Sequence, residues 1–388
     1  MISAAADPGS FRDPGSRVFL DGEAILRAVY PASSADYEAF RDSGLLAQLI
    51  REKRLVDTEE VDASRISPGQ DAAYVLRHPA LPFISYPYEW PFSLLKKAAL
   101  FQLDILTTAL DRGFTLTDAS AYNVQFDGTR PIFIDHLSFR PYEEGEIWTA
   151  HRQFCMQFLN PIILWSRLGV APNAWFRGNL EGIEPEQLAP LLRWRDRLSW
   201  TALAHVILQG KFQQRANSGE GREVAVRETK LAKSSFKGLL SGLRSFIDKT
   251  QPPGKRTVWG EYAGSNSYAD AEAQEKRRFV SKVVSTARPR ILFDLGCNTG
   301  DYSIAALEAG AQYAVGFDFD FGALEQAVNR AESDKLRFLP LWLDATNPSP
   351  DQGWGQKERK GFGERVKGDA VLALAFIHHL AIARNIPL

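Results

Sequence analysis

The sequence feature that most constrains the fold is a glycine-containing run that directly follows a predicted buried strand, in residues 294–300 (Asp-Leu-Gly-Cys-Asn-Thr-Gly). A helical pattern begins just beyond it. Gly296 and Gly300 lack the Cβ atoms that would keep a ligand away from the backbone, and a helix N-terminus offers free N–H groups. The run therefore predicts a ligand-binding bend between a strand and a helix.

The spacing of these glycines excludes two common nucleotide-binding loops. A dinucleotide-binding loop carries glycine at its first, third and sixth positions, whereas counting from Gly296 gives Asn298 and Asp301 at the third and sixth. A phosphate-binding loop requires Gly-Lys-Ser/Thr, which this run does not contain. The bend is suited to a ligand without phosphates.

The residues around the bend predict alternating helices and strands. We expect helices at 269–286, 302–309 and 322–332, and strands at 290–295, 313–317, 336–343 and 370–375. Alternation at this spacing predicts right-handed crossovers and a parallel sheet.

The run 294–300 resembles motif I of class I S-adenosylmethionine (SAM) dependent methyltransferases, and three later positions agree with that family. Asp318 ends the second predicted strand, where the family binds the two ribose hydroxyls, and Asp344 follows the third, where it contacts the adenine amino group. Residues 369–379 resemble motif IV.

The resemblance implies a Rossmann-like sheet with SAM as the cofactor. The implied cofactor-binding residues are Asp294, Gly296, Asn298, Gly300, Asp318, Asp344 and Tyr268. The alternatives are an ordinary tight turn for the glycines, a helix N-cap for Asp318 and a loop acid for Asp344.

Two further segments of this family contribute residues near the transferred methyl group. His378 follows the fourth strand and is a candidate general base, with core packing or a helix start as the alternative. Tyr268 lies in the segment that folds over the methionine end of SAM, with Trp259, Tyr262 and Lys276 nearby. A tyrosine hydroxyl and a cation suit a carboxylate, although core or surface roles stay open for each.

The resemblance also bears on the methyl acceptor, which the sequence does not name. The Asn-Pro-Pro-aromatic run of DNA amino-group methylases is missing, because Ala375 stands at its Asn position. This argues against an exocyclic base amine and favours oxygen or another acceptor. Trp259 together with residues 266–268 and 377–380 is similar to a bacterial methyltransferase subfamily that includes nodulation-related members.

A complete domain of this family has seven strands in the order 3-2-1-4-5-7-6. The chain reaches only the fourth strand, so the resemblance implies that residues 257–388 form the N-terminal half of the domain. We expect strand four to be an exposed apolar edge, and the chain to bind SAM weakly or to be inactive.

Residues 1–210 predict an α+β domain that accompanies the methyltransferase part and selects substrate. We expect hairpins at 16–30 and 121–137 and helices at 36–60 and 92–112. Asp118, Asn123 and Asp135 resemble the catalytic loop and the metal-binding Asp of kinase-like phosphotransferases. Leu116 replaces the usual His, however, and neither a glycine-rich loop nor a Lys–Glu pair can be assigned.

Three interpretations of this constellation stay open. The first is a hairpin whose Asp and Asn cap turns. The second is a degenerate kinase-like module that binds a nucleotide or a partner, accompanied by a silent methyltransferase part. The third is an active phosphotransferase.

The charge is uneven, although the formal net charge is only -1. Residues 211–256 contain eleven basic and four acidic residues, and we interpret them as an interdomain linker with a short helix at 236–247. RNA binding through this stretch is the alternative, and it is not favoured.

The rest of the composition bears on compartment and metal binding. Cys155 and Cys297 form neither a disulfide framework nor metal-ligand spacing, so no metal site is expected from them. The N-terminus does not resemble a secretory signal, and the longest apolar stretch is too short to span a bilayer. These features favour a cytoplasmic protein.

Overall fold

The computed structural model describes residues 5–22, 24–63, 66, 71–193, 231–252, 267–374, 376–377 and 379–387. These residues form two compact units. The N-terminal unit comprises Met1–Ala80, Lys96–Gln125 and Ile132–Pro253, and the C-terminal unit comprises Leu81–Leu95, Phe126–Pro131 and Gly254–Leu388. Two short segments from the first 131 residues therefore pack with the C-terminal unit.

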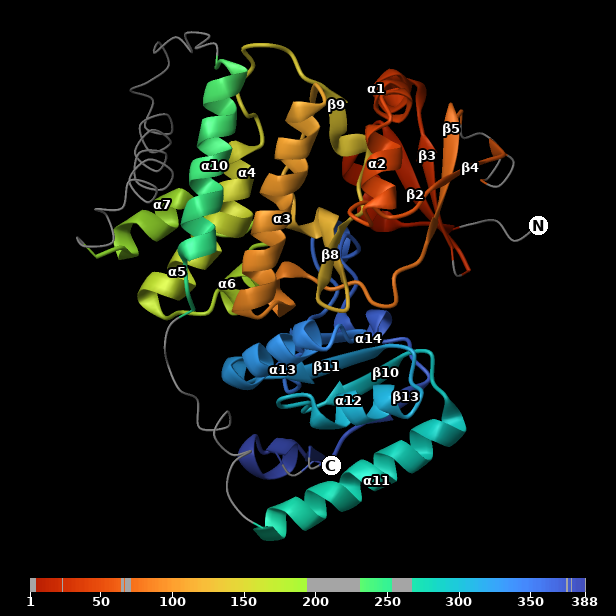
Figure 1. The fold of residues 1–388 in the computed structure, drawn as a ribbon, viewed down its shortest axis with the longest axis vertical. Helices are drawn as coiled ribbons and strands as arrows, with labels where there is room; N and C mark the ends of the chain where they lie inside the picture. Colours follow the sequence, from red (N-terminus) through yellow and green to blue (C-terminus); the bar gives the residue numbers. More distant parts are fainter. Residues whose placement is uncertain are drawn as a thin grey trace. The chain divides into compact units, whose positions relative to one another are not determined.

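The C-terminal unit is built on a four-stranded parallel sheet (Figure 1). Its strands, in spatial order, are β12 (Phe338–Trp342), β11 (Ala314–Asp318), β10 (Leu292–Leu295) and β13 (Ala370–Leu372). In chain order these are the third, second, first and fourth strands, so the predicted Rossmann-like sheet is confirmed. In the described part of the unit, β13 pairs with β10 alone, and Val371 at this edge is 58% exposed.

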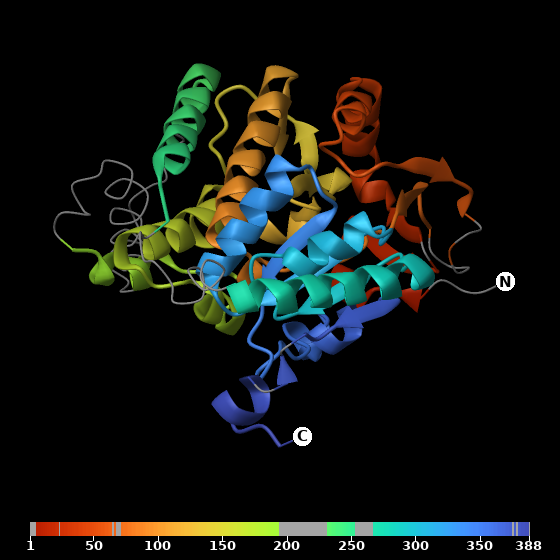
Figure 2. The ribbon, with the colours of Figure 1, turned by 60° about the horizontal axis from the view of Figure 1, so that its bottom comes forward.

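Three helices contribute to the core on one face of this sheet (Figure 2). They are α11 (Ser267–Ala287), α12 (Asp301–Glu308) and α13 (Phe321–Ser333). Val280 and Val284 of α11, Ile304 of α12 and Leu324 of α13 are buried with Leu292 of β10. Helix α12 begins directly after the glycine-containing bend, so the core fixes the helix whose N-terminus faces the predicted site.

The aromatic residue next to Leu292 packs with a second cluster. Successive strand residues point to opposite faces, and Phe293 contacts Phe83 with ring centroids 5.9 Å apart. Phe83 also contacts Phe317, which in turn contacts Phe362 at the start of α14 (Phe362–Arg365). This cluster therefore contains Phe83, which lies more than two hundred residues before the sheet in the chain.

The N-terminal unit contains a five-stranded antiparallel sheet in the order β1-β2-β3-β5-β4. The strands are β1 (Ala5–Ala6), β2 (Ser16–Asp21), β3 (Ala24–Val29), β4 (Glu59–Val61) and β5 (Tyr74–Pro79). The predicted hairpin at 16–30 and the α+β class are confirmed. The predicted continuous helix at 36–60 is wrong, because left-handed Gly44 separates α1 (Pro31–Asp42) from α2 (Leu45–Arg51) and β4 follows.

The remaining elements up to residue 188 are mostly helical, and two of them, α3 and the β7–β8 hairpin, have residues in both units. Helix α3 (Phe92–Asp111) matches its prediction and begins within the segment assigned to the C-terminal unit. The predicted hairpin at 121–137 is formed by β7 (Val124–Asp127) and β8 (Arg130–Phe133). The other elements are β6 (Phe114–Leu116), β9 (Phe139–Pro141), α4 (His151–Phe154), the π-helical η6 (Cys155–Leu159), α5 (Asn160–Leu168), α6 (Asn173–Gly178) and α7 (Pro185–Leu188).

The described part of the basic stretch is a helix of the N-terminal unit, α10 (Lys233–Lys249). One face of it is buried through Phe236, Leu240, Leu243 and Ile247. Two of its cations form ion pairs within the unit, Lys237 with Asp111 and Arg244 with Asp104, both at 2.6 Å. Residues 211–230 and 253–256 lie outside the described residues.

Among the helices that the structure describes, none is long and apolar enough to cross a membrane.

Candidate cofactor site and an N-terminal carboxylate cluster

The bend after β10 adopts a backbone that favours glycine at two of its positions. Gly296 has φ +78° and Gly300 has φ +87°, and Asn298 between them has φ +48°. A Cβ atom on Gly300 would lie 2.5 Å from Cε1 of Phe338. Any side chain at Gly300 would thus force the Phe338 ring or the bend to move.

Asp318 lies at the end of β11, the strand next to β10, and contacts the bend. Its Oδ2 accepts a hydrogen bond from the backbone N–H of Asn298 at 2.9 Å, and its Oδ1 accepts one from the N–H of Asp320 at 2.8 Å. Burial raises the pKa of the Asp318 carboxyl. The structure thus brings Asp318 to the predicted bend.

The N-cap of the following helix is Asp320, not Asp318. Asp320 Oδ1 accepts hydrogen bonds from the N–H groups of Gly322 at 2.7 Å and Ala323 at 3.0 Å, at the start of α13. The capping alternative for Asp318 is therefore wrong.

Asp294, in β10, and Cys297, in the bend, are both buried. Asp294 is 1% exposed and accepts a hydrogen bond from Ser303 Oγ of α12 at 2.7 Å, and burial raises its pKa to about 6. Burial also raises the pKa of Cys297 well above that of an ordinary thiol. A Cβ on Gly316 of β11 would lie 2.8 Å from the Cys297 Sγ. The glycine therefore allows Cys297 to pack closely on β11.

Asp344 closes a turn after β12. Its Oδ1 accepts hydrogen bonds from the backbone N–H of Thr346 at 3.0 Å and from the Thr346 hydroxyl at 2.6 Å. These bonds are those of the loop acid that the sequence left as an alternative. A contact to adenine stays a prediction.

Sequence reasoning missed the aromatic residues at this edge of the sheet. Phe319 follows Asp318 directly and is 48% exposed. Trp342, at the end of β12, donates its Nε1–H to the Phe319 carbonyl at 3.1 Å and stacks on Phe321 at 5.8 Å. Aromatic residues at the ends of two neighbouring strands were the signal that could have identified them.

Several predicted residues lie outside the described part of the chain. His378, Trp259, Tyr262 and Ala375 are not described, and Tyr268 lies in α11 but its side chain is not described. Lys276 forms an ion pair with Glu272 one turn earlier in α11, at 2.6 Å.

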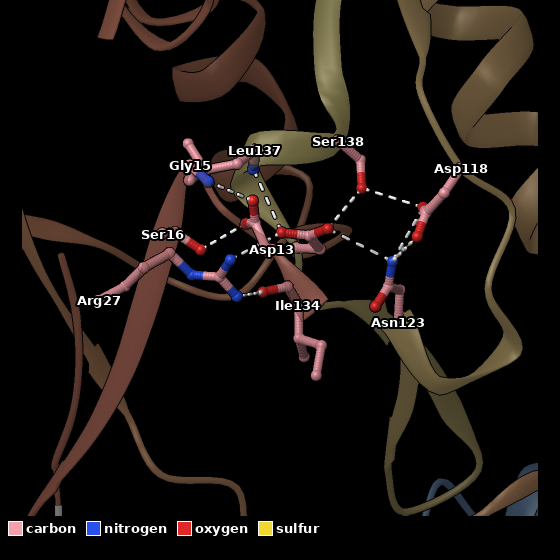
Figure 3. Close-up of polar contacts among 10 residues, drawn as sticks. Asp13, Gly15, Ser16, Arg27, Asp118, Asn123, Ile134, Leu137 and Ser138 are labelled. Atoms are coloured by element: carbon pink, nitrogen blue, oxygen red, sulfur yellow. Dashed lines mark hydrogen bonds and ion pairs between the residues drawn. The ribbon is translucent and has the colours of Figure 1, made fainter. Parts of the chain in front are cut away.

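In the N-terminal unit, hydrogen bonds join Asp118, Asn123 and Asp135, while the phosphotransferase resemblance stays a prediction. Asn123 Nδ2 donates to both oxygens of Asp118, at 3.0 and 3.2 Å, and to Asp135 Oδ2 at 3.4 Å (Figure 3). Ser138 Oγ bridges the two carboxylates at 3.1 Å and 2.5 Å, and Arg27 of β3 pairs with Asp135 at 2.8 Å. We call these five residues the carboxylate cluster.

The backbone around Asp118 is fixed by two glutamines of the neighbouring helices. The N–H of Ala119 donates to Gln153 Oε1 and that of Ala121 to Gln157 Oε1, both at 2.7 Å. Gln157 lies in the π-helical η6, where the Met156 carbonyl accepts a hydrogen bond from the N–H of Ile183 at 2.9 Å. Gln157, which lies in this π-helical turn, thus holds the backbone of the loop between Asp118 and Asn123.

The two carboxylates of the cluster differ in their surroundings. Burial, and next the neighbouring Asp135, raise the pKa of Asp118 to about 7. Asp135 Oδ1 accepts from Arg27 and from the N–H of Leu137 at 3.2 Å, while Oδ2 accepts from Ser138 and Asn123. A carboxylate offers about four acceptor positions, so donors already fill those of Asp135.

A divalent metal, which the phosphotransferase resemblance implies, does not fit Asp135 in this arrangement. Among the described residues, no group of three or more His, Cys, Asp or Glu side chains is placed to hold a metal ion.

Comparisons with known proteins place the chain in a family. No known protein-family profile matches it. It is 45% identical over 395 residues to the nodulation protein NoeA of Rhizobium meliloti (strain 1021), in a match that covers 100% of this chain and 83% of NoeA.

A crystal structure from Pyrococcus horikoshii, described as that of an RNA methyltransferase, is 20% identical in sequence to this chain. The match covers 26% of this chain and 49% of that chain, with a TM-score of 0.18. That similarity is too low to support a conclusion. The identity to NoeA, over the whole of this chain and 83% of NoeA, shows that the chain belongs to the NoeA family of nodulation proteins.

Proposed function

We propose that the C-terminal unit binds S-adenosylmethionine and transfers its methyl group to an acceptor. The observation that carries this proposal is the hydrogen bond from the Asn298 N–H to Asp318, because it joins the glycine-containing bend to the carboxylate of the next strand. The parallel sheet and the predicted motif order support the same function.

The residues at this edge of the sheet fit the cofactor. Asp318 holds its carboxylate at the end of β11, beside the bend, and a carboxylate in that place suits a ribose hydroxyl as a donor. The exposed ring of Phe319 offers an apolar surface beside this carboxylate, which suits a flat base. SAM, when bound, supplies an electrophilic methyl carbon on its sulfonium.

The protein's own contribution is to position the acceptor and the bend. Holding two reactants in line can lower the barrier by about 7–11 kcal/mol at best. A general base is required only where the acceptor must lose a proton, and His378 is our candidate for that role. We propose oxygen as the acceptor atom, because the motif that methylases use for base amines is missing from residues 372–378.

A calorimetric titration of SAM into the whole chain tests the proposal. Because the sequence predicts weak binding, the titration is run at high protein concentration. Asp318→Ala should abolish the heat of binding, whereas Asp334→Ala, which removes an exposed acid after α13, should not change it. Equal binding by wild type and Asp318→Ala would refute the assignment.

A second experiment tests the acceptor atom. Bacterial extract is incubated with the protein and with SAM that carries an isotope-labelled methyl group. The chemical shift of the labelled carbon distinguishes a methyl on oxygen from one on nitrogen.

The convergence of Asp118, Asn123 and Asp135 favours a second candidate function, in which the N-terminal unit binds a nucleotide. The filled acceptor positions of Asp135 argue against metal-dependent phosphoryl transfer. Titration with ATP, with and without Mg²⁺, tests this. Binding that is independent of Mg²⁺ and is weakened by Asp135→Ala is expected, and an absence of binding in both titrations excludes the function.

A further inference from the structure

Arg330, on the last turn of α13, reaches the bend between β10 and α12. Its Nη1 donates to the Thr299 carbonyl at 2.9 Å and to Asp301 Oδ1 at 2.8 Å. The Thr299 hydroxyl lies 3.4 Å from the same Nη1 and donates to Asp301 Oδ2 at 3.1 Å. One guanidinium therefore contacts the bend and the first residue of the helix that follows.

The peptide between Thr299 and Gly300 is held at both of its polar groups. Its carbonyl accepts from Arg330, and its N–H donates to the Cys297 carbonyl at 2.8 Å. The residues on either side of Thr299, Asn298 and Gly300, have left-handed backbones, which are unfavourable for a residue with a side chain. Rotation of this peptide would break both hydrogen bonds.

We infer that Arg330 is a positioning residue for the cofactor, which acts by fixing the bend in the shape that binds it. The inference rests on the proposed function, because it concerns the same site. Arg330 acts through its hydrogen bond to the Thr299 carbonyl. The donor of this bond is charged, and such a hydrogen bond is stronger than one from a neutral donor. Its ion pair with Asp301 contributes little, because the two side chains are 35% and 52% exposed.

Calorimetric titration with SAM tests this role in the whole chain. Arg330→Ala should raise the Kd about tenfold, which corresponds to about 1.4 kcal/mol. Arg330→Lys keeps a cationic donor and should recover part of the affinity. The matched control is Asn329→Ala, an exposed neighbour on the same helix, which should bind SAM as the wild type does.

Two further measurements separate positioning from general stability. The melting temperature of Arg330→Ala should stay close to that of the wild type. Hydrogen exchange at the N–H of Gly300 should become faster, while exchange in β10 should not change.

Three results would overturn the inference. The first is wild-type SAM affinity in Arg330→Ala, and the second is unchanged exchange at Gly300. The third is a loss of affinity that follows a lowered melting temperature and is not recovered by Arg330→Lys. If the wild type does not bind SAM, the proposed function fails, and the exchange at Gly300 still decides whether Arg330 fixes the bend.

Discussion

Removing the Glu89 carboxylate should destabilise the C-terminal unit strongly. Arg365 and Glu89 form a two-bond ion pair, with Arg365 Nη1 3.0 Å from Glu89 Oε2 and Nη2 bonded to Oε1, and each side chain is 4% exposed. Glu89 Oε2 also accepts the N–H of Tyr86 at 2.8 Å. Glu89→Ala therefore leaves a buried guanidinium and a backbone N–H without their acceptor.

The magnitude follows from this burial. Breaking one partner of a buried ion pair costs about 3–5 kcal/mol, which is a large fraction of the roughly 5–15 kcal/mol that stabilises a protein. Arg365 keeps its hydrogen bond to the Ile84 carbonyl at 2.7 Å and its contact with the Tyr86 ring, so the lower half of that range is expected.

Hydrogen exchange measured on peptides from β10 and β11 gives the free energy of opening for this unit. Glu308→Ala is the control, because it breaks an exposed ion pair of the same unit, with Arg277, and should cost less than about 1 kcal/mol. The double variant Glu89→Leu with Arg365→Met should recover most of the loss, since apolar residues can replace a buried pair. An effect of Glu89→Ala no larger than that of Glu308→Ala would refute the reasoning.

Two further predictions concern the bend and the carboxylate cluster. Gly300→Ala should lower the free energy of unfolding by at least about 1–3 kcal/mol, because the left-handed backbone and the 2.5 Å approach to Phe338 both oppose a Cβ. Gly363→Ala is the control and should be near neutral, because a Cβ there meets open space. Thermal denaturation of both variants checks this, and equal melting temperatures would contradict it. The pKa of Asp118 is raised from 3.8 to about 7 in the folded protein, so the folded state binds the extra proton and stability should fall as the pH rises through about 7. Asp118→Asn removes this titration. The free energy of unfolding of the variant, minus that of the wild type, should therefore be larger at about pH 8 than at about pH 5, as measured by urea denaturation at the two pH values. A difference that does not depend on pH would contradict the assignment.

The sheet and the bend could be predicted because both depend on residues that are close together in the sequence. Short apolar runs alternating with helical periods specify parallel strands, and the carboxyl ends of such strands meet at one edge. This is why Asp318 could be expected beside Gly296 and Gly300, although 18 residues separate it from the nearer glycine.

The contacts that the sequence did not predict are those between distant segments. Phe83 and Glu89 contact residues that follow them by more than two hundred positions, and their own neighbourhood of prolines and aromatics indicates only a turn-rich segment. Arg330 was missed because a charged residue near the end of an amphipathic helix has the pattern of a solvent-facing residue. The break at Gly44 was missed because apolar residues continue at helical spacing on both sides of it.

The assignment of Leu81–Leu95 to the C-terminal unit has a consequence for synthesis on the ribosome. Glu89 is made 276 residues before its partner Arg365. At a translation rate of about 5–20 residues per second, Glu89 waits roughly 14–55 s for this partner. During that interval Phe83 and Tyr86 are available to chaperones, so the yield of native protein should depend on chaperone supply more than it would if each unit came from one continuous stretch of chain.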